Sequence, residues 1–325
     1  MLALTGGLLV LTIVVGIGVS LLSRDAYWFY NRGIDAVHHR ALESALELFS
    51  KTLKKNSRYW PAYYNLGLIY QQQGRIQDAK AAYQNVLQLV GEEFATLFNL
   101  GLIAIDEQNY PQAKDCFEKA RSLNTEDADT HYNLGRVFEA LGNIEEAISA
   151  YQQATMLDEN SSSAFLMLGK LRDKTQAYES AISAYQKCLD IDPNNIEANY
   201  EMAITMAKKG DWDESIIYSQ KAVDLDPTFA KGQNQLGLAL YCKNRPDEAV
   251  PHYQKAIQID PNYANAYNNL GYAFEKLERY QDAIDTFELY KLKSLNSSDH
   301  QEVDEHIQFL FEKLNGPIDT PTPAP

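Results

Sequence analysis

The sequence predicts an all-α fold: an α-solenoid of eight helix–turn–helix repeats with an N-terminal transmembrane helix and a C-terminal capping helix. Three observations lead to this prediction. The 325-residue chain begins with an apolar segment, most of the rest repeats with a fixed period, and an amphipathic segment follows the last repeat. Hydrophobic residues make up 45% and charged residues 22% of the chain, which is ordinary globular usage and argues against a disordered protein.

Residues 1–25 are predicted to form a membrane anchor with its juxtamembrane residues. From Leu2 to Leu22, thirteen of twenty-one residues are Leu, Ile or Val, and the first charged side chain is Arg24. At about 1.5 Å per residue, such a helix spans roughly 30 Å, the thickness of a bilayer core. No basic residue precedes this segment and several follow it, which favours an uncleaved anchor and a cytoplasmic body. We therefore expect a single-pass membrane protein whose first helix contacts lipid; the alternative is a periplasmic or exported body with a cleaved signal.

The tripeptide Asn-Leu-Gly defines the period. It begins at Asn65, Asn99 and Asn133, at equal intervals of thirty-four positions, and returns at Asn269, four periods later. In blocks of this length counted from Ala26, position 20 is always small and position 24 is aromatic in seven blocks of eight. Apolar residues at positions 4, 7, 8 and 11 form one helical stripe, and glycine at position 8 permits close helix approach. The predicted blocks are 26–59, 60–93, 94–127, 128–161, 162–195, 196–229, 230–263 and 264–297.

This pattern resembles the tetratricopeptide repeat (TPR), whose 34-residue unit combines Leu-Gly, a small residue and an aromatic residue. The resemblance covers 272 of the 325 residues. It implies two helices per block, stacked so that neighbouring blocks bury each other's apolar faces, with the first helices forming a concave surface.

A capping helix is predicted at residues 298–316. Val303, Ile307, Leu310 and Leu314 recur at helical spacing and would cover the apolar end of the last block. Residues 317–325 contain four prolines and are predicted to be a disordered tail.

The sequence predicts a protein that is not an enzyme and that has no cofactor and no metal site. P-loop, HExxH, GxSxG and dinucleotide motifs are absent, and the 28 residues outside anchor and blocks are too few for a catalytic domain. The six histidines are not spaced for a metal, and the three cysteines form no CxxC pair. A formal net charge of -15 argues against binding to nucleic acid.

The candidate binding residues lie in the first helix of each block. Asparagine fills position 6 in five blocks, and its amide can donate to and accept from a peptide backbone. Aromatic residues fill position 5 in five blocks, and lysines at position 13 of three blocks would favour an acidic stretch. The alternatives are family consensus for the asparagines, packing between helices for the aromatic residues and a solvated face for the lysines. The candidates are Asn31, Asn65, Asn99, Asn133, Asn269, Tyr30, Tyr64, Phe98, Tyr132, Tyr200, Lys174, Lys208 and Lys276.

These observations favour a membrane-tethered TPR scaffold. It would bind an extended segment of a partner protein in its concave groove and organise a protein complex at the membrane. One alternative is a non-catalytic regulatory or substrate-presenting subunit of a membrane-associated enzyme. Another is an exported interaction protein with a cleaved signal. Self-association stays open.

Overall fold

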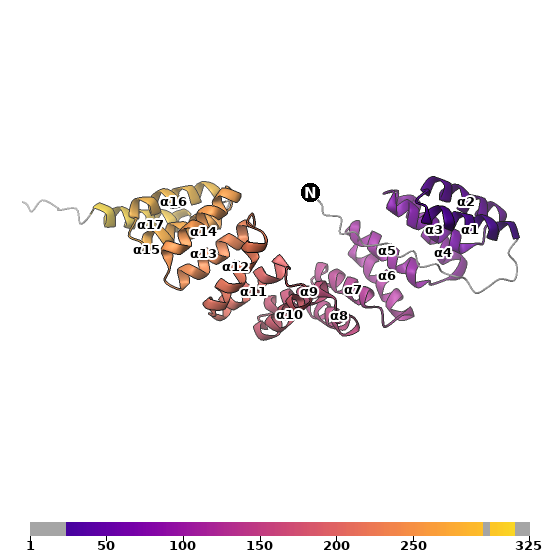
Figure 1. Ribbon diagram of the computed structural model, residues 1–325, viewed down its shortest axis with the longest axis horizontal. Helices are drawn as coiled ribbons and strands as arrows, with labels where there is room; N and C mark the ends of the chain where they lie inside the picture. Colours follow the sequence, from indigo (N-terminus) through magenta and orange to yellow (C-terminus); the bar gives the residue numbers. More distant parts are fainter. Residues whose placement is uncertain (1–23, 295–299, 316–325) are drawn as a thin grey trace, which may run out of the picture. The chain divides into compact units, whose positions relative to one another are not determined.

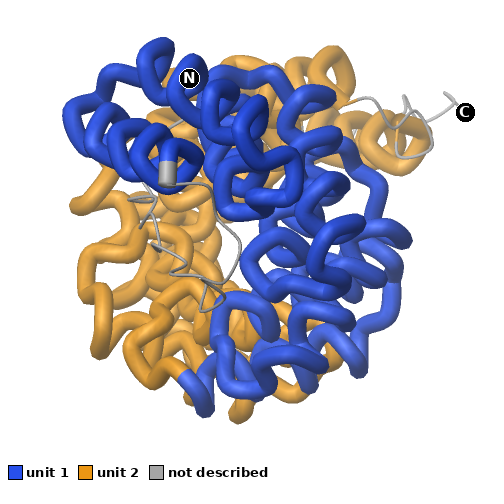
Figure 2. The backbone as a smooth tube through the Cα atoms, turned by 90° about the vertical axis from the view of Figure 1, so that its right-hand side faces the viewer, with its two compact units in different colours: residues 1–157 blue, residues 158–325 orange. Residues whose placement is uncertain are grey.

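The computed structural model describes residues 24–294 and 300–315 (Figure 1). Within these residues it contains seventeen α-helices and no strand, so the predicted all-α solenoid fold is confirmed. The chain divides into two compact units, residues 1–157 and residues 158–325, here called unit 1 and unit 2 (Figure 2). In both units the helices form pairs, in which each odd-numbered helix from α1 to α15 packs on the even-numbered helix that follows it.

The helices of unit 1 are α1 (Arg24–His38), α2 (Leu42–Lys55), α3 (Trp60–Gln72), α4 (Ile76–Val90), α5 (Phe94–Asp106), α6 (Tyr110–Leu123), α7 (Ala128–Ala140) and α8 (Ile144–Leu157). Those of unit 2 are α9 (Ser162–Lys174), α10 (Tyr178–Ile191), α11 (Ile196–Lys209), α12 (Trp212–Leu225), α13 (Ala230–Cys242), α14 (Pro246–Ile259), α15 (Ala264–Lys276), α16 (Tyr280–Lys293) and α17 (His300–Asn315).

The turn between the two helices of a pair has the same backbone conformation in every block. Position 15 has a positive φ in all eight, although only three of these residues are glycine. In the second block, the Gly74 N–H donates to the Gln71 carbonyl at 3.0 Å and the Arg75 N–H donates to the Tyr70 carbonyl at 2.8 Å. This pair of bonds is the Schellman ending of an α-helix, which requires a left-handed residue. The position-15 residues are Arg40, Gly74, Gln108, Gly142, Gln176, Gly210, Asn244 and Glu278.

The close approach within each pair is made by the glycine at position 8 and the aromatic ring at position 24. A Cβ atom added to that glycine would lie 2.4 to 2.7 Å from the ring in seven blocks, so no larger residue fits without movement. The sixth block differs at both positions at once: it has Ala203 and Ser219, both fully buried. A methyl group at position 8 is therefore present only in the block that has no aromatic ring at position 24.

Helix α17 packs on α16 and covers the end of the last block. Ile307 and Leu310 are buried in a cluster with Leu270 and Phe287, as the apolar spacing predicts. Leu314, which the same spacing places in that stripe, is instead 42% exposed. The predicted tail at 317–325 lies outside the described residues.

The predicted single-pass membrane localisation is contradicted. In the described part of the chain, no helix is both long and apolar enough to cross a membrane. The physical reason is length, because these helices have 13 to 16 residues and a spanning helix needs about 20. Of the predicted anchor and juxtamembrane residues 1–25, residues 1–23 lie outside the described residues, and Arg24 and Asp25 begin α1.

Candidate functional site

The predicted position-5 aromatic residues pack inside the repeats. Tyr30 and Tyr64 are buried, whereas Phe98, Tyr132 and Tyr200 are half-buried. In the first four blocks, the position-5 ring centroid lies 5.5 to 6.0 Å from the position-24 ring of the same block. Burial raises the pKa of Tyr30, and it raises the pKa of Tyr200 to about 12, so both phenols stay protonated at neutral pH. Only the half-buried members offer ring surface to a ligand.

Three of the predicted position-6 asparagines connect neighbouring blocks. In each case the side-chain Nδ2 donates to the position-5 side chain of the preceding block, 35 residues earlier. The acceptor is a tyrosine hydroxyl twice and an asparagine carbonyl once. The pairs are Asn65 with Tyr30 at 3.2 Å, Asn99 with Tyr64 at 3.3 Å, and Asn269 with Asn234 at 2.9 Å.

Each of these asparagines therefore has at least one amide hydrogen engaged inside the protein. Asn65 also donates to the Pro61 carbonyl at 2.8 Å, which uses its second amide hydrogen. Asn133 donates to the Asp129 carbonyl at 2.8 Å. Asn31 is exposed. Asn65, Asn99 and Asn269 thus link neighbouring blocks, which leaves fewer of their amide hydrogens for a peptide backbone.

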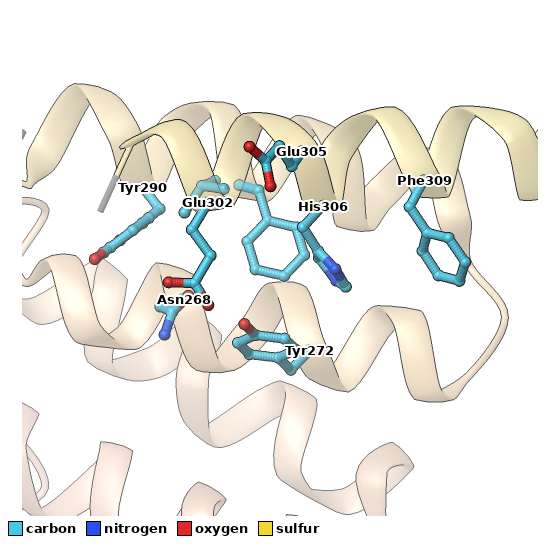
Figure 3. A pocket seen from close by; sticks show the side chains of 9 residues that line it. Asn268, Tyr272, Tyr290, Glu302, Glu305, His306 and Phe309 are labelled. Atoms are coloured by element: carbon cyan, nitrogen blue, oxygen red, sulfur yellow. The ribbon is translucent and has the colours of Figure 1, made fainter. Parts of the chain in front are cut away.

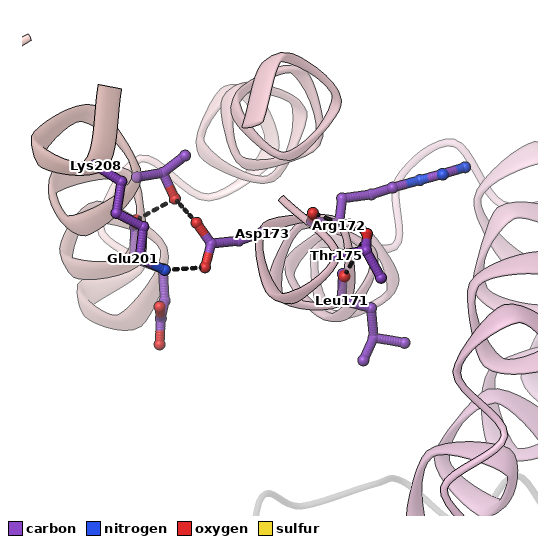
Figure 4. A network of polar contacts seen from close by, with 7 residues as sticks. Leu171, Arg172, Asp173, Thr175, Glu201 and Lys208 are labelled. Carbon is purple, nitrogen blue, oxygen red and sulfur yellow. Dashed lines mark hydrogen bonds and ion pairs between the residues drawn. The ribbon is translucent and has the colours of Figure 1, made fainter. Parts of the chain in front are cut away.

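Two of the three predicted lysines also connect neighbouring blocks. The Lys208 ammonium pairs with the buried Asp173 carboxylate, whose other oxygen accepts from the Thr205 hydroxyl at 2.8 Å (Figure 4). Lys276 lies 4.5 Å from the centre of the Tyr241 ring. Both lysines contact position 12 of the preceding block, again 35 residues earlier.

The remaining predicted lysine, Lys174, is exposed at the end of α9. Beside the Asp173 network, burial raises the pKa of Glu201, while the positive charge of Lys170 opposes this shift.

The sequence analysis missed Asp173, Thr205 and Asn234 as partners of the predicted residues. A signal was available. If consecutive blocks are aligned with an offset of one residue, so that residue i is compared with residue i+35, the donors Asn65, Asn269 and Lys208 face the acceptors Tyr30, Asn234 and Asp173. This offset arises because position 6 of one first helix lies beside position 5 of the preceding one.

Unit 2 also contains a pocket of about 410 Å³ between α15, α16 and α17 (Figure 3). Aromatic walls come from Tyr272, Tyr290 and Phe309, and carboxylates come from Glu302 and Glu305. At its edge the His306 Nε2 atom lies 2.9 Å from Oε2 of Glu275 on α15. None of these residues was among the predicted candidates, because the pocket forms only where α17 replaces the first helix of a further block.

The described residues offer little for nucleophilic or metal chemistry. Among them, no group of three or more His, Cys, Asp or Glu side chains could hold a metal ion. Burial raises the pKa of the Cys116 and Cys242 thiols, and it raises the pKa of Cys188 to about 11, which leaves all three as weak nucleophiles at neutral pH.

Comparison with known proteins agrees with this architecture. A TPR repeat model matches residues 174–210 and 237–278, and tetratricopeptide repeat models match residues 92–160 and 60–90. The chain belongs to the tetratricopeptide repeat family. The fold of this TPR protein is that of a protein-interaction scaffold. No curated protein matches the chain.

Solved TPR structures share the fold. A TPR protein from Parabacteroides merdae is 17% identical with a TM-score of 0.55, covering 78% of this chain and 98% of its own. The Pseudomonas aeruginosa pilF structure is 19% identical with a TM-score of 0.56, covering 64% of this chain and 95% of its own. YrrB, described as a TPR protein with an unusual peptide-binding site, is 23% identical with a TM-score of 0.53, covering 60% of this chain and 100% of its own.

Proposed function

We propose that this TPR protein binds an extended segment of a partner protein along the first helices of unit 2 and so holds that partner in a complex. The observation that carries the proposal is the contact between successive first helices: α9 with α11, α11 with α13, and α13 with α15. Equivalent positions of these helices therefore follow one another along one face.

Position 9 shows what this face offers. Lys170, Ile204 and Leu238 are half-buried, and Tyr272 is exposed. A row that mixes apolar area with charge and reaches solvent is suited to an extended segment, since apolar contacts supply affinity and polar contacts set the register. YrrB, which shares this fold, is described as having a peptide-binding site, and this supports peptide binding by the present TPR protein.

Introducing a negative charge at position 9 tests the proposal. Ile204→Asp and Leu238→Asp place a carboxylate where apolar contact is expected, whereas Gln220→Asp and Gln254→Asp place one on exposed second-helix positions. We expect the first-helix variants to recover about tenfold less partner in a quantitative pull-down. The second-helix variants should recover as much as the unmodified protein.

Equal recovery with all four variants, at unchanged helical content by circular dichroism, would contradict binding along this face. The position-6 asparagines are unsuitable for this test, because replacing Asn65 or Asn269 also removes a bond between blocks.

A further inference from the structure

The pocket between α15, α16 and α17 differs in chemistry from the rest of the first-helix face. Its lining contains no lysine and no arginine, but it contains two carboxylates and several aromatic rings. Tyr272 is 40% exposed and Phe309 is 46% exposed, so both rings reach an incoming group. Figure 3 shows Glu302 directed from α17 toward Asn268 and Tyr272 of α15.

The electrostatic surroundings of the pocket are negative. Burial is the main cause that raises the pKa of Tyr272, and the negative charges of Glu302 and Glu275 raise it further. On α16, Lys291 is engaged by Glu288 at 2.9 Å and by Asp304. Glu305 accepts a hydrogen bond from Gln301 at 3.1 Å, whereas Glu302 has no ion-pair partner among the described residues. Glu302 therefore offers a carboxylate to a cation from outside, beside the exposed ring of Tyr272.

The Phe309 ring shows that rings of this pocket attract cations, but it is itself engaged within the chain, because His306 stacks on it at 6.0 Å between ring centres. The Lys313 ammonium, one turn further along α17, lies 5.3 Å from the centre of the Phe309 ring. Ring faces attract ammonium and guanidinium groups within about 6 Å of their centres. The volume of about 410 Å³ lies within the range of small-ligand pockets, roughly 300–1,000 Å³, and has room for a long side chain.

From this geometry we infer that the pocket binds a lysine or arginine side chain of the partner's extended segment, with Tyr272 contacting its charged head, Phe309 contacting its apolar stem and Glu302 pairing with the charge. The inference rests on the proposed function, because it assigns one specificity pocket to the proposed binding face. It predicts that the partner segment carries a basic residue where it passes α15 and α17.

The test uses the full chain and short synthetic peptides. The probes are acetyl-Gly-Gly-Xaa-Gly-Gly-amide, in which Xaa is lysine, arginine, norleucine or glutamate, and saturation-transfer NMR measures their binding. Norleucine keeps an apolar stem without the charge. We expect the side-chain methylenes of the lysine and arginine peptides to receive saturation, and the norleucine and glutamate peptides to bind at least threefold more weakly.

Matched variants test whether the peptides bind in the pocket. Glu302→Gln should weaken binding of the arginine peptide about threefold to fivefold, while Glu312→Gln, the same charge change at an exposed position of α17 outside the pocket, should leave it unchanged. Tyr272→Phe should retain binding and Tyr272→Leu should lose it. The inference is overturned if the norleucine peptide binds as well as the lysine peptide, or if Glu302→Gln has no more effect than Glu312→Gln. No natural partner is needed, so failure here leaves the proposed binding along the first helices standing.

Discussion

The contact between Gly101 on α5 and Phe117 on α6 gives a quantitative test of how the two helices of a repeat pack. An alanine Cβ at position 101 would lie 2.7 Å from the ring of Phe117, which is fully buried. The ring cannot swing away freely, because its centroid lies 5.5 Å from that of Phe98. Overpacking of this kind costs about 1–3 kcal/mol. Helix propensity favours alanine over glycine by about 1 kcal/mol. Gly101→Ala should therefore lower the free energy of unfolding by about 0–2 kcal/mol.

A double-mutant cycle separates the two effects. Phe117→Leu removes the ring at its own cost of about 1–3 kcal/mol. In that background the added methyl group has space, so Gly101→Ala should stabilise the protein by about 1 kcal/mol. The predicted coupling energy between the two positions is thus about 1–3 kcal/mol. The sixth block provides a natural comparison, because it has Ala203 at position 8 and Ser219 at position 24. Ala203→Gly should destabilise the protein by about 1 kcal/mol, because removing this methyl group relieves no clash with an aromatic ring.

Urea unfolding followed by Trp60 fluorescence measures the cycle. Trp60 packs in the same cluster as Leu100 and Cys116, so its emission reports on the region around α5 and α6. Trp28→Phe and Trp212→Phe in all four proteins remove the other two tryptophan signals. The reasoning is refuted if Gly101→Ala stabilises by about 1 kcal/mol in both backgrounds, because propensity alone would then account for it.

Three further predictions concern the turns and the Asp173 network. Asp173→Ala should destabilise unit 2 by about 1–3 kcal/mol, whereas Lys208→Met should cost less than about 1 kcal/mol, because the lysine side chain is 42% exposed. If urea unfolding shows that Lys208→Met costs more than Asp173→Ala, the assignment of Asp173 as the buried centre of the network is contradicted. Glu278→Gly should raise stability by up to about 1 kcal/mol, because residue 278 has a φ of 57°, and a lowered midpoint would rule out strain at this turn. Because burial raises the pKa of Glu201, its ionisation lowers stability as pH rises through that pKa. Glu201→Gln should therefore raise the urea midpoint at about pH 7 and give no gain at about pH 4, and equal gains at both would exclude this cause.

The sequence predicted that the two helices of a repeat approach closely at the position-8 glycine, but not which side chain that glycine contacts. The repeat period places glycine at position 8 and an aromatic ring at position 24, and the structure brings them together as one contact. The left-handed turn at position 15 was harder to predict. Arg40, Gln108 and Glu278 occupy it without glycine, and the Schellman bonds impose the conformation in spite of the side chain.

Contacts between repeats were predicted poorly, because they depend on how neighbouring helices are offset. A helical wheel for one block places Asn65 away from its own packing stripe, which suggested a role in peptide binding. The neighbouring block supplies Tyr30 as the partner for that amide. The pocket at α17 has the same origin, since Tyr272 and Glu302 belong to different helices and meet only through the packing of the last helices.

Site-specific photo-crosslinking tests the central claim, binding along the first helices of unit 2, most directly. A photoreactive phenylalanine is placed at Ile204 or Leu238 on first helices, and at Gln220 or Gln254 on second helices, in the full chain. Mass spectrometry then identifies the crosslinked peptide. We predict that positions 204 and 238 crosslink to adjacent residues of one partner segment, while positions 220 and 254 give no crosslink to it. Crosslinks to the same segment from positions 220 and 254, with none from 204 and 238, would contradict the proposed binding face.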